Sequence, residues 1–212
     1  MKNKTLILVG GGGHCKSVIE VAESAGWEIA GVLDTFENVG KNVLDYPVIG
    51  TDELIPLWAG RAEFVVTVGQ IKSAALRRDL HKKISDAKGR LATLIAPTAY
   101  VSSRASIGEG SVVMHHALVN AEARIGAGCI VNTFAGVEHD AVVGDFCHIS
   151  TGALVNGNCS VGEGSFLGSQ SVMVNGTSIC SGCVVAAGAV VRKNIVSKGI
   201  YSGNPALLKI KL

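Results

Sequence analysis

The chain has 212 residues, and its 19 Lys and Arg nearly balance its 17 Asp and Glu, which leaves a formal net charge of +2 at pH 7. This balance gives no electrostatic basis for binding nucleic acid or an anionic membrane. The apolar runs all stay short of the roughly 18 residues that a transmembrane helix requires, so we expect no membrane span and a cytoplasmic protein. The length fits one large domain or two small ones.

The first 97 residues alternate short apolar runs with helical patterns. A buried strand is predicted at 5–9, and the glycine-rich loop Gly10–His14 follows it directly. A helix at 16–25 and a second strand at 28–33 complete a strand–loop–helix–strand unit. The acidic residue Asp34 stands at the end of the second strand.

The glycine loop resembles a dinucleotide-binding fingerprint only in part. Gly10 and Gly12 fit it, but Cys15 occupies the third glycine position, and a chain of this length lacks the second mononucleotide-binding half. The backbone N–H groups at a helix N-terminus can nevertheless hold a phosphate or pyrophosphate. The alternative interpretation is a tight strand-to-helix turn that binds no ligand.

The same alternation continues beyond Asp34. The predicted elements are a short strand or turn at 46–50, a helix opened and capped by Thr51, a strand at 64–68, an amphipathic helix at 73–88 and a last strand at 91–95. Alternating strands and helices imply a small parallel sheet with helices on both faces, and hence a Rossmann-like domain over 1–97. His81 lies among charges in the middle of a predicted helix, so we expect it on the solvated surface.

Ligands of such a sheet bind beyond the carboxyl ends of its strands. The residues predicted at these positions are Gly11, Gly12, Gly13, His14, Asp34, Thr35, Gly69 and Gln70. They form the candidate site for a nucleotide moiety.

Residues 101–191 carry a six-residue repeat. Every sixth residue from Val101 to Val191 is aliphatic or Met, and the residue two places before each one, from Ala105 onward, is Ala, Ser, Thr or Cys. This period fits neither an amphipathic helix nor an alternating strand and is typical of a parallel β-helix, in which three hexads make one triangular coil. We predict about five coils, with both repeated positions pointing inward.

Most of the cysteines fall on this repeat. Cys129, Cys147, Cys159 and Cys183 occupy the small inward position, where Cys acts as a small apolar residue. Cys180 and Cys183 also form a C-x-x-C pair, which is a redox or zinc motif in other contexts. No second pair accompanies it, and the repeat places Cys183 inward and Cys180 outward. We therefore interpret the pair as structural and predict no metal site.

His139 falls at an outward position of the repeat, between Glu138 and Asp140. A neighbouring carboxylate can fix the tautomer of an imidazole and favour proton uptake at its other nitrogen, as a general base requires. The alternative interpretation is a solvated polar corner.

The other histidines of the repeat also fall at outward positions. His148 follows His139 by half of a coil, so the two lie on opposite sides of one column and can cooperate only where two columns meet. This geometry predicts a site between identical subunits in a closed cyclic assembly. His115 and His116 either rim the same cleft or are ordinary surface residues.

Basic residues gather after the repeat ends. Residues 97–212 contain seven Lys and Arg, and five of these are Arg192, Lys193, Lys198, Lys209 and Lys211. Such a cluster suits a polyanionic ligand that lies along the column. It is equally compatible with a solvated tail.

These features together resemble the NeuD/PglD-type family of sugar acetyltransferases, which are left-handed β-helix, hexapeptide-repeat acyltransferases. The resemblance rests on the hexads, on the sequences 12–16 (GGHCK) and 138–140 (EHD), and on the tail 203–206 (GNPA). It covers the whole chain. It implies a Rossmann-like nucleotide-sugar-binding domain at 1–97, a left-handed β-helix acetyltransferase domain at 98–212, a homotrimer, and acetyl-CoA as co-substrate without a metal.

The resemblance also implies a role for individual residues. His139 corresponds to the general base and Asp140 to its acidic partner. The residues implied for acetyl-CoA, including the start of the basic cluster, are His148, Gly168, Ala186, Ala187, Arg192 and Lys193. The candidate nucleotide site of the first domain would hold the uridine diphosphate part of a sugar nucleotide.

The implied activity is direct acetyl transfer from acetyl-CoA to the 4-amino group of a nucleotide-linked amino sugar, for example a UDP-4-amino sugar, in surface-glycan biosynthesis. Two departures from the family pattern stand out. Cys15 replaces a glycine after His14, and Asp34-Thr35 carries one acid where some members carry two or three. One alternative is O-acetylation of a sialic acid, and another, of a different class, is a non-catalytic or zinc-dependent β-helix protein.

Overall fold

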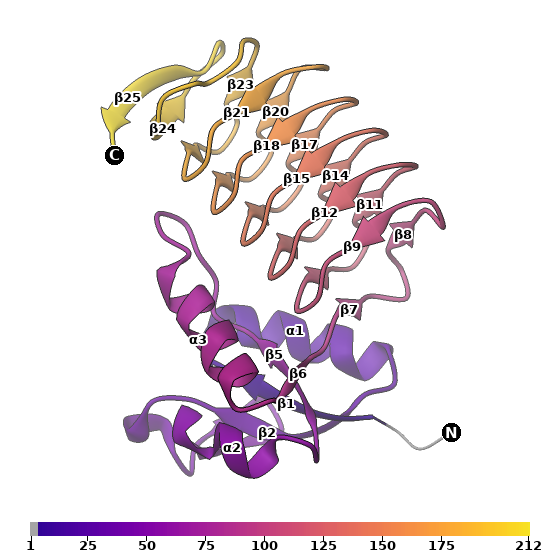
Figure 1. Cartoon of the computed structure of the whole chain (residues 1–212), viewed down its shortest axis with the longest axis vertical. Coiled ribbons are helices and arrows are strands. Elements are labelled where there is room, and N and C mark those ends of the chain that lie inside the picture. The colour runs from indigo at the N-terminus through magenta and orange to yellow at the C-terminus, as the bar shows by residue number, and fades with distance from the viewer. Residues whose placement is uncertain (1–3) are drawn as a thin grey trace. The chain divides into compact units, whose positions relative to one another are not determined.

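The computed structural model describes residues 4–212, so the first three residues of the predicted N-terminal domain lie outside it. The chain divides into two compact units, and Figure 1 shows a helix-covered sheet in the first and a stack of coils in the second. The first unit contains the residues up to Gly69 together with 75–97. The second unit contains 70–74 together with 98–212.

The first unit is built on a six-stranded sheet in the order β3-β4-β2-β1-β5-β6. Its strands are β1 (Thr5–Val9), β2 (Glu28–Leu33), β3 (Asn42–Val43), β4 (Tyr46–Gly50), β5 (Glu63–Val66) and β6 (Arg90–Leu91). Strand β1 pairs in parallel with β2 and β5, which pair in parallel with β4 and β6. The predicted parallel sheet is confirmed, and β3 adds an antiparallel edge beside β4.

The helices of this unit connect the strands. They are α1 (Gly13–Ser24), η1 (Phe36–Asn38), η2 (Asp52–Leu54), α2 (Ile55–Trp58) and α3 (Ala75–Asp86). The hydroxyl of Thr51 accepts a hydrogen bond from the backbone N–H of Glu53, which confirms the predicted cap. Gly12 is the N-cap of α1, so the glycine loop leads directly into the first turn of that helix.

Both faces of the sheet are buried. Ile7 and Val9 of β1 pack with residues of α2 and α3, including Ile55 and Ile84. Because side chains alternate along a strand, Leu8 faces the other way, and it is also fully buried. The sheet is therefore covered on both sides, as the alternating pattern predicted.

Two expectations for this unit are wrong in detail. The single strand predicted at 91–95 is broken, because β6 pairs with β5 and β7 (Leu94–Ile95) belongs to another sheet. His81 is not on the surface but 5 % exposed within α3. Burial, with the nearby positive charge of Arg77, lowers the pKa of His81 to about 4, so the ring is neutral at pH 7.

The second unit is a stack of triangular coils made of two-residue strands (Figure 1). In chain order they are β8 (Tyr100–Val101), β9 (Ser106–Ile107), β10 (Val112–Val113), β11 (Leu118–Val119), β12 (Arg124–Ile125), β13 (Ile130–Val131), β14 (Gly136–Val137), β15 (Val142–Val143), β16 (His148–Ile149), β17 (Leu154–Val155), β18 (Ser160–Val161), β19 (Phe166–Leu167), β20 (Val172–Met173), β21 (Ser178–Ile179), β22 (Val184–Val185) and β23 (Val190–Val191). The strands coincide with the predicted hexads, which confirms a parallel β-helix.

Every third strand belongs to the same wall of the column. The three walls run through β10-β13-β16-β19-β22, through β8-β11-β14-β17-β20-β23, and through β9-β12-β15-β18-β21. Val112 pairs with Ile130 and Ile130 with His148, so each coil consists of three hexads. The backbone N–H of Val112 accordingly donates to the carbonyl of Cys129 at 2.8 Å.

The interior of the column is dry and aliphatic. Of the sixteen aliphatic or Met positions of the repeat, all but Val101 and Ile107 at the open N-terminal end are buried. The small positions are buried with them, from Ser111 to Ala189. Burial of this much branched apolar surface is the main stabilising contribution to the column.

The small inward residues also satisfy backbone carbonyls at one corner. Successive coils contribute one residue each to this corner, and these residues are Ser111, Cys129, Cys147, Ser165 and Cys183. The Cys129 Sγ lies 3.1 Å from the carbonyl oxygen of Gly144, and the Cys147 Sγ lies 3.2 Å from that of Gly162. A buried carbonyl without a donor costs free energy, so this corner favours small residues with an S–H or O–H group.

The C-x-x-C pair departs from the expected arrangement. Cys183 points inward as predicted, but Cys180 is only partly exposed and packs against the core. The two Sγ atoms lie 3.3 Å apart, and both cysteines are free thiols. The outward position predicted for Cys180 is wrong because the turn between the two residues brings their side chains to the same side.

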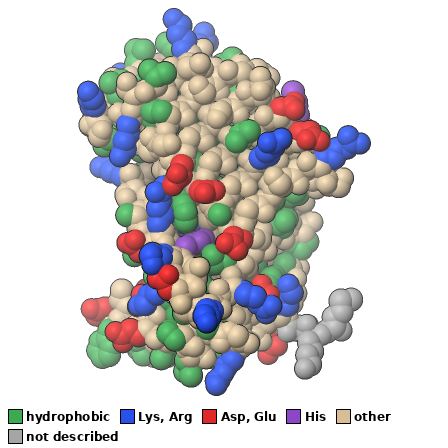
Figure 2. Space-filling model, viewed as in Figure 1, with side chains coloured by type: hydrophobic (Ala, Val, Ile, Leu, Met, Phe, Trp, Pro, Cys, Tyr) green, Lys and Arg blue, Asp and Glu red, His purple; other side chains and the backbone are tan. Residues whose placement is uncertain are grey.

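The chain ends in a hairpin of β24 (Gly199–Ser202) and β25 (Leu207–Lys211). Strand β24 pairs in parallel with β22, and β25 pairs with β24 in antiparallel orientation. Tyr201 is 8 % exposed and joins the core of the column, so the hairpin closes its last coil. Acidic and basic side chains are interspersed over the face of the molecule that Figure 2 shows.

We predict that Cys147→Leu destabilises the column by about 1–3 kcal/mol, because the inward corner has no room for the larger side chain. Cys147→Ser, which keeps a donor for the Gly162 carbonyl, is the matched control and is expected to stay close to the parent. Urea unfolding followed by circular dichroism measures both. Equal stability of the Leu variant and the parent would contradict the packing described here.

Candidate functional site

His139 and Asp140 lie side by side in the turn that follows β14. His139 Nδ1 is 2.8 Å from Asp140 Oδ2, and both side chains are more than half exposed. An ionised carboxylate only accepts hydrogen bonds, so Nδ1 carries the proton and the lone pair of Nε2 remains available. The pair therefore has the arrangement of an imidazole base oriented by a carboxylate.

The backbone of this turn is fixed by the neighbouring coils. Asp140 has φ of +60°, a left-handed conformation that Asp tolerates better than most residues. Its N–H donates to the Ala121 carbonyl of the preceding coil, while the His139 carbonyl accepts from the N–H of Asn158 in the next. The imidazole is thus carried by backbone that is hydrogen-bonded on both sides.

Gly157 provides the surface on which the imidazole rests. It follows His139 by one coil, and a Cβ atom at this position would lie 2.7 Å from both Cε1 and Nε2 of the ring. Any side chain here would displace the imidazole. Asn175 lies one coil further along, and its Nδ2 atom would lie 3.3 Å from the same added Cβ atom.

The second carboxylate beside His139 has another partner. Glu138 Oε2 accepts a hydrogen bond of 2.7 Å from Asn120 Nδ2. Asn120 in turn accepts from the N–H of Ala121, so its amide is oriented. Glu138 therefore forms a hydrogen bond to the preceding coil, and Asp140 is the carboxylate that contacts His139.

His148 projects from the column at the predicted outward position, but it is not exposed. It is 8 % exposed, its ring meets Phe166 edge-on, and its Nδ1 lies 3.0 Å from the backbone oxygen of Gln70. Asn132 Nδ2 lies 3.1 Å from His148 Nε2. Both ring nitrogens therefore have partners inside the second unit.

These contacts define the tautomer of His148. The Asn132 Oδ1 atom accepts from the N–H of Thr133 at 2.7 Å, which turns the NH₂ group of Asn132 to His148 Nε2. Nε2 is then an acceptor, and the ring proton is on Nδ1, where it is donated to Gln70. His148 in this state offers its N–H to the backbone and not to a ligand.

The segment around Gln70 is part of the second unit. Gln70 is 6 % exposed, and its Nε2 donates to the Phe146 carbonyl at 2.6 Å. Residues 70–74 belong to the second unit, whereas the exposed Gly69 belongs to the first. Gln70 therefore belongs to a different compact unit from the other predicted nucleotide-binding residues.

The predicted acetyl-CoA residues of the later coils form two groups. Gly168 packs directly on the next coil, because a Cβ there would lie 2.5 Å from the Ala187 N and 2.7 Å from the Ala186 carbonyl carbon. Arg192 and Lys193 are exposed and line a cavity of about 400 Å³ at the end of the column. The lining of this cavity also includes the apolar side chains of Leu207 and Leu208 and the ring of Tyr201.

The predicted nucleotide residues of the first unit gather at the carboxyl ends of β1 and β2. Gly11 is in close contact with Asp34, since a Cβ at Gly11 would lie 2.6 Å from Asp34 Oδ2. Asp34 also accepts from Asn38 Nδ2 at 2.9 Å. Gly12 and Gly13 are exposed where α1 begins, and the N–H groups of such a turn point outward and favour anions.

Cys15 and His14 follow in the first turn of α1. Burial raises the pKa of the Cys15 thiol to about 11, so the residue that replaces the third glycine stays protonated and inert at pH 7. His14 is half-buried beside Gly69, and a Cβ atom added at Gly69 would lie 3.8 Å from the His14 Cβ.

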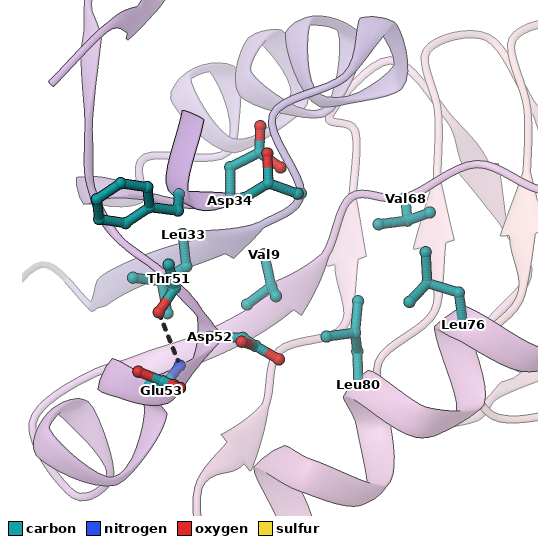
Figure 3. A pocket seen from close by; sticks show the side chains of 12 residues that line it. Val9, Leu33, Asp34, Thr51, Asp52, Glu53, Val68, Leu76 and Leu80 are labelled. Atoms are coloured by element: carbon teal, nitrogen blue, oxygen red, sulfur yellow. Dashed lines mark hydrogen bonds between the residues drawn. The ribbon is translucent and has the colours of Figure 1, made fainter. Parts of the chain in front are cut away.

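A cavity of about 460 Å³ opens beside these residues in the first unit (Figure 3). Its walls are the apolar side chains of Val9, Leu33, Val68, Leu76 and Leu80. Its rim carries three carboxylates, those of Asp34, Asp52 and Glu53, and the aromatic ring of Phe36, which is 81 % exposed. An apolar slot with polar acceptors and an exposed ring suits a nucleoside.

His115 and His116 do not contact His139 through any hydrogen bond or ring contact among residues 4–212. His115 Nδ1 lies 2.8 Å from the Thr98 hydroxyl, and the His116 ring stacks on Phe134 at 5.0 Å. Both have structural partners within the column, and we assign them no role in the site.

Three site residues were missed from the sequence. Gly157 and Asn175 follow His139 by one and two coils, so stepping along the repeat in whole coils would have found them. Asn132 has no such signal, because it reaches His148 from a neighbouring corner. Within residues 4–212, no helix has the length and apolarity to cross a membrane, and no cluster of three or more His, Cys, Asp or Glu could hold a metal.

Comparison with known proteins places these features in a family. Residues 5–84 match the model of the PglD N-terminal domain, and residues 159–193 match that of the hexapeptide repeat of succinyl-transferase. The structure is similar to a histidine-to-alanine mutant of GDP-perosamine N-acetyl transferase from Caulobacter crescentus, with a TM-score of 0.91 and 33 % identity over 97 % of this chain and 96 % of that one. The chain belongs to the NeuD/PglD-type family of sugar acetyltransferases.

Two further relatives agree with this membership. The acetyltransferase domain of PglB from Neisseria gonorrhoeae, solved with acetyl coenzyme A, has a TM-score of 0.90 and 35 % identity over 98 % of this chain and 100 % of that one. UDP-N-acetylbacillosamine N-acetyltransferase from Bacillus subtilis is 36 % identical over 116 residues, which span about half of each chain. The predicted fold, a Rossmann-like domain and a left-handed parallel β-helix, is confirmed.

We predict that Gly157→Ala lowers kcat by about 10²-fold, because it displaces His139, the candidate general base, by roughly 1 Å. The backbone at Gly157 is not in the left-handed region, so the added methyl group acts through the His139 ring. Steady-state kinetics would show the loss in kcat with little change in the KM for acetyl-CoA. In a His139→Ala background the same substitution is expected to have no further effect.

Proposed function

We propose that the enzyme transfers an acetyl group from acetyl-CoA to the 4-amino group of a nucleotide-linked amino sugar. Relatives that cover the whole chain support the substrate class, since one was solved with CoA and GDP-perosamine and another with acetyl coenzyme A. The curated relative from Bacillus subtilis is named for a UDP-linked sugar. A UDP-4-amino sugar of surface-glycan biosynthesis is our first choice, and its GDP counterpart is the matched comparison.

The observation that carries the proposal is the contact of 2.8 Å between His139 Nδ1 and Asp140 Oδ2. It leaves Nε2 as a proton acceptor on the outer face of a rigid column. In the proposed reaction, His139 takes the proton from the amine while the nitrogen attacks the thioester carbonyl. The C–S bond then breaks and the thiol of CoA leaves, and Asp140 stabilises the imidazolium that His139 has become.

Direct transfer needs no acyl-enzyme. Among residues 4–212, no Cys or Ser side chain is hydrogen-bonded to His139, so the pair has no activated nucleophile beside it. Backbone N–H groups suit the developing oxyanion better than the His148 side chain does. The single ring N–H of neutral His148 is already given to the Gln70 carbonyl.

The two substrates would use different parts of the chain. The cavity beside Asp34 has the size and lining for a nucleoside, and the first turn of α1 at Gly12 and Gly13 would hold its diphosphate. The cavity lined by Arg192 and Lys193 supplies positive charge beside apolar side chains, which fits the phosphorylated adenosine end of acetyl-CoA. Gly168, Ala186 and Ala187 would border the coenzyme arm.

Association into a homotrimer is part of the proposal. His139 follows a strand of one wall, whereas Gly168 and Ala186 follow strands of another, so an acetyl-CoA that borders these two residues would reach the His139 of a neighbouring column. A cyclic trimer would repeat that contact three times.

A cytoplasmic location of the enzyme remains a prediction.

We predict that His139→Ala lowers kcat by about 10²- to 10⁴-fold, the usual contribution of a general base. Binding of acetyl-CoA, measured by calorimetry, is expected to stay unchanged because His139 acts on the amine. Asp140→Asn leaves the ring in place but removes the charge that stabilises the imidazolium, so it is expected to show a smaller loss of kcat. Normal turnover by the His139 variant would refute the assignment.

A substrate panel separates the candidate acceptors. We expect thiol release from acetyl-CoA with a UDP-4-amino sugar and less or none with free sialic acid. GDP- and dTDP-linked 4-amino sugars complete the panel and show which nucleobase the cavity of the first unit accepts. Turnover of sialic acid alone would replace N-acetylation by O-acetylation, with the same role for His139.

A matched variant tests the nucleotide end. In Gly11→Ala the new methyl group would lie 2.6 Å from Asp34 Oδ2, so the loop or the carboxylate must shift. We expect the KM for the sugar nucleotide to rise by about tenfold or more, the equivalent of one lost hydrogen bond, while the KM for acetyl-CoA stays constant. A rise in the KM for acetyl-CoA alone would contradict this division of the substrates.

A further inference from the structure

The last coil of the column holds two thiols that the proposed function does not use. Cys180 and Cys183 flank the turn Ser181-Gly182, and their Sγ atoms lie 3.3 Å apart. Gly182 has φ of +69°, which allows the turn to close tightly. Residues that flank a two-residue turn have Cα atoms within about 7 Å, which is compatible with the geometry of a disulfide.

The two thiols have different surroundings. Cys183 is fully buried, and burial together with the contact to the Cys180 thiol raises its pKa to about 12. Cys180 is partly exposed, so it is the thiol of the pair that we expect a small molecule to reach. The side chain of Lys198 lies over Gly182, where a Cβ would come within 2.8 Å of its Cε. One thiol is thus accessible, and the other is placed behind it.

We propose that Cys180 and Cys183 form a thiol–disulfide exchange site that reacts with small disulfides and closes into an intramolecular disulfide. The Cys180 thiolate attacks one sulfur of the disulfide RSSR, which forms a mixed disulfide and releases RS⁻. Cys183 then loses its proton and attacks the Cys180 sulfur, which forms the protein disulfide and releases a second RS⁻. The protein loses two electrons and two protons, and RSSR is reduced to two RSH.

The geometry favours closure at this pair. The sulfurs must approach by only about 1.3 Å to reach bonding distance, which side-chain rotation within the turn can provide. Cys129 and Cys147 also contact each other between coils, but both are fully buried and donate to backbone carbonyls. They have no path for an external disulfide, so exchange is confined to the last coil.

The pair is linked to the cavity that carries Arg192 and Lys193. Cys183 Sγ lies 3.7 Å from the Ser197 carbonyl oxygen, which also accepts from the Tyr201 hydroxyl at 2.7 Å. Ser197 and Tyr201 both line that cavity. Oxidation removes the Cys183 S–H and shifts its sulfur, so we expect a weaker fit for acetyl-CoA. This consequence, unlike the exchange itself, rests on the proposed function.

The test uses the full-length enzyme incubated with oxidised glutathione, followed by titration of thiols in denaturant and peptide mass mapping. We expect the six free thiols of the chain to fall to four, with a link between Cys180 and Cys183. Serine already occupies the equivalent inward position at Ser111 and Ser165, so we expect Cys183→Ser to fold. In this variant the reaction is expected to stop at a mixed disulfide on Cys180. Cys180→Ser is expected to remain unmodified.

Retention of six thiols by the parent, or glutathione attached to Cys183 in the Cys180→Ser variant, would overturn the exchange site. A second measurement addresses the link to the cavity. The KM for acetyl-CoA is expected to rise several-fold on oxidation of the parent and to stay constant for the Cys180→Ser, Cys183→Ser double variant. A disulfide that forms with no change in KM would overturn only the link, and an inactive reduced enzyme would refute the proposed function instead.

Discussion

Backbone hydrogen bonds between one coil and the next set the register of the column. The N–H of Val112 donates to the carbonyl of Cys129 and that of Leu118 to Ala135, and the same coil-to-coil bond recurs along the walls. Because this ladder gives every coil the same length of three hexads, an outward side chain always lies over its equivalent in the next coil. His139 over Gly157 is such a pair, so the same ladder that forms the fold also positions the proposed base.

The ladder also explains which residues the column accepts at its corners. Small residues are required where consecutive coils approach, and those with an S–H or O–H group satisfy carbonyls that would otherwise be buried without a donor. Cysteine meets both needs and adds chemistry only where solvent can reach it. In the closed middle of the column Cys147 is inert, whereas at the last coil Cys180 is accessible beside a second thiol.

The fold could be predicted from the sequence because every hexad repeats the same pattern of one aliphatic and one small residue. The phase of the repeat is well defined because sixteen positions agree from Val101 to Val191. The proximity of Gly11 and Asp34 was also predictable, since the two residues follow strands that pair side by side in the sheet. His139 and Asp140 were predictable as neighbours because they are adjacent in sequence.

Other features depend on packing that no local pattern reports. The charges around His81 suggested surface, yet the turn of α3 places its ring inward. His148 was predicted to project outward and does so, but its ring contacts the backbone oxygen of Gln70, which side-chain patterns do not encode. The direction of Cys180 was mispredicted for a related reason, since the two-residue turn and not the hexad decides it.

The central claim is that backbone registry holds His139 with its proton on Nδ1 and Nε2 open. Nitrogen NMR of the enzyme labelled in its imidazoles tests this most directly, with the His139→Ala variant to assign the signals. The account predicts that neutral His139 shows a protonated Nδ1 and a proton-free Nε2, and that His148 stays a neutral Nδ1–H ring near pH 7. A neutral His139 that carries its proton on Nε2 would contradict it.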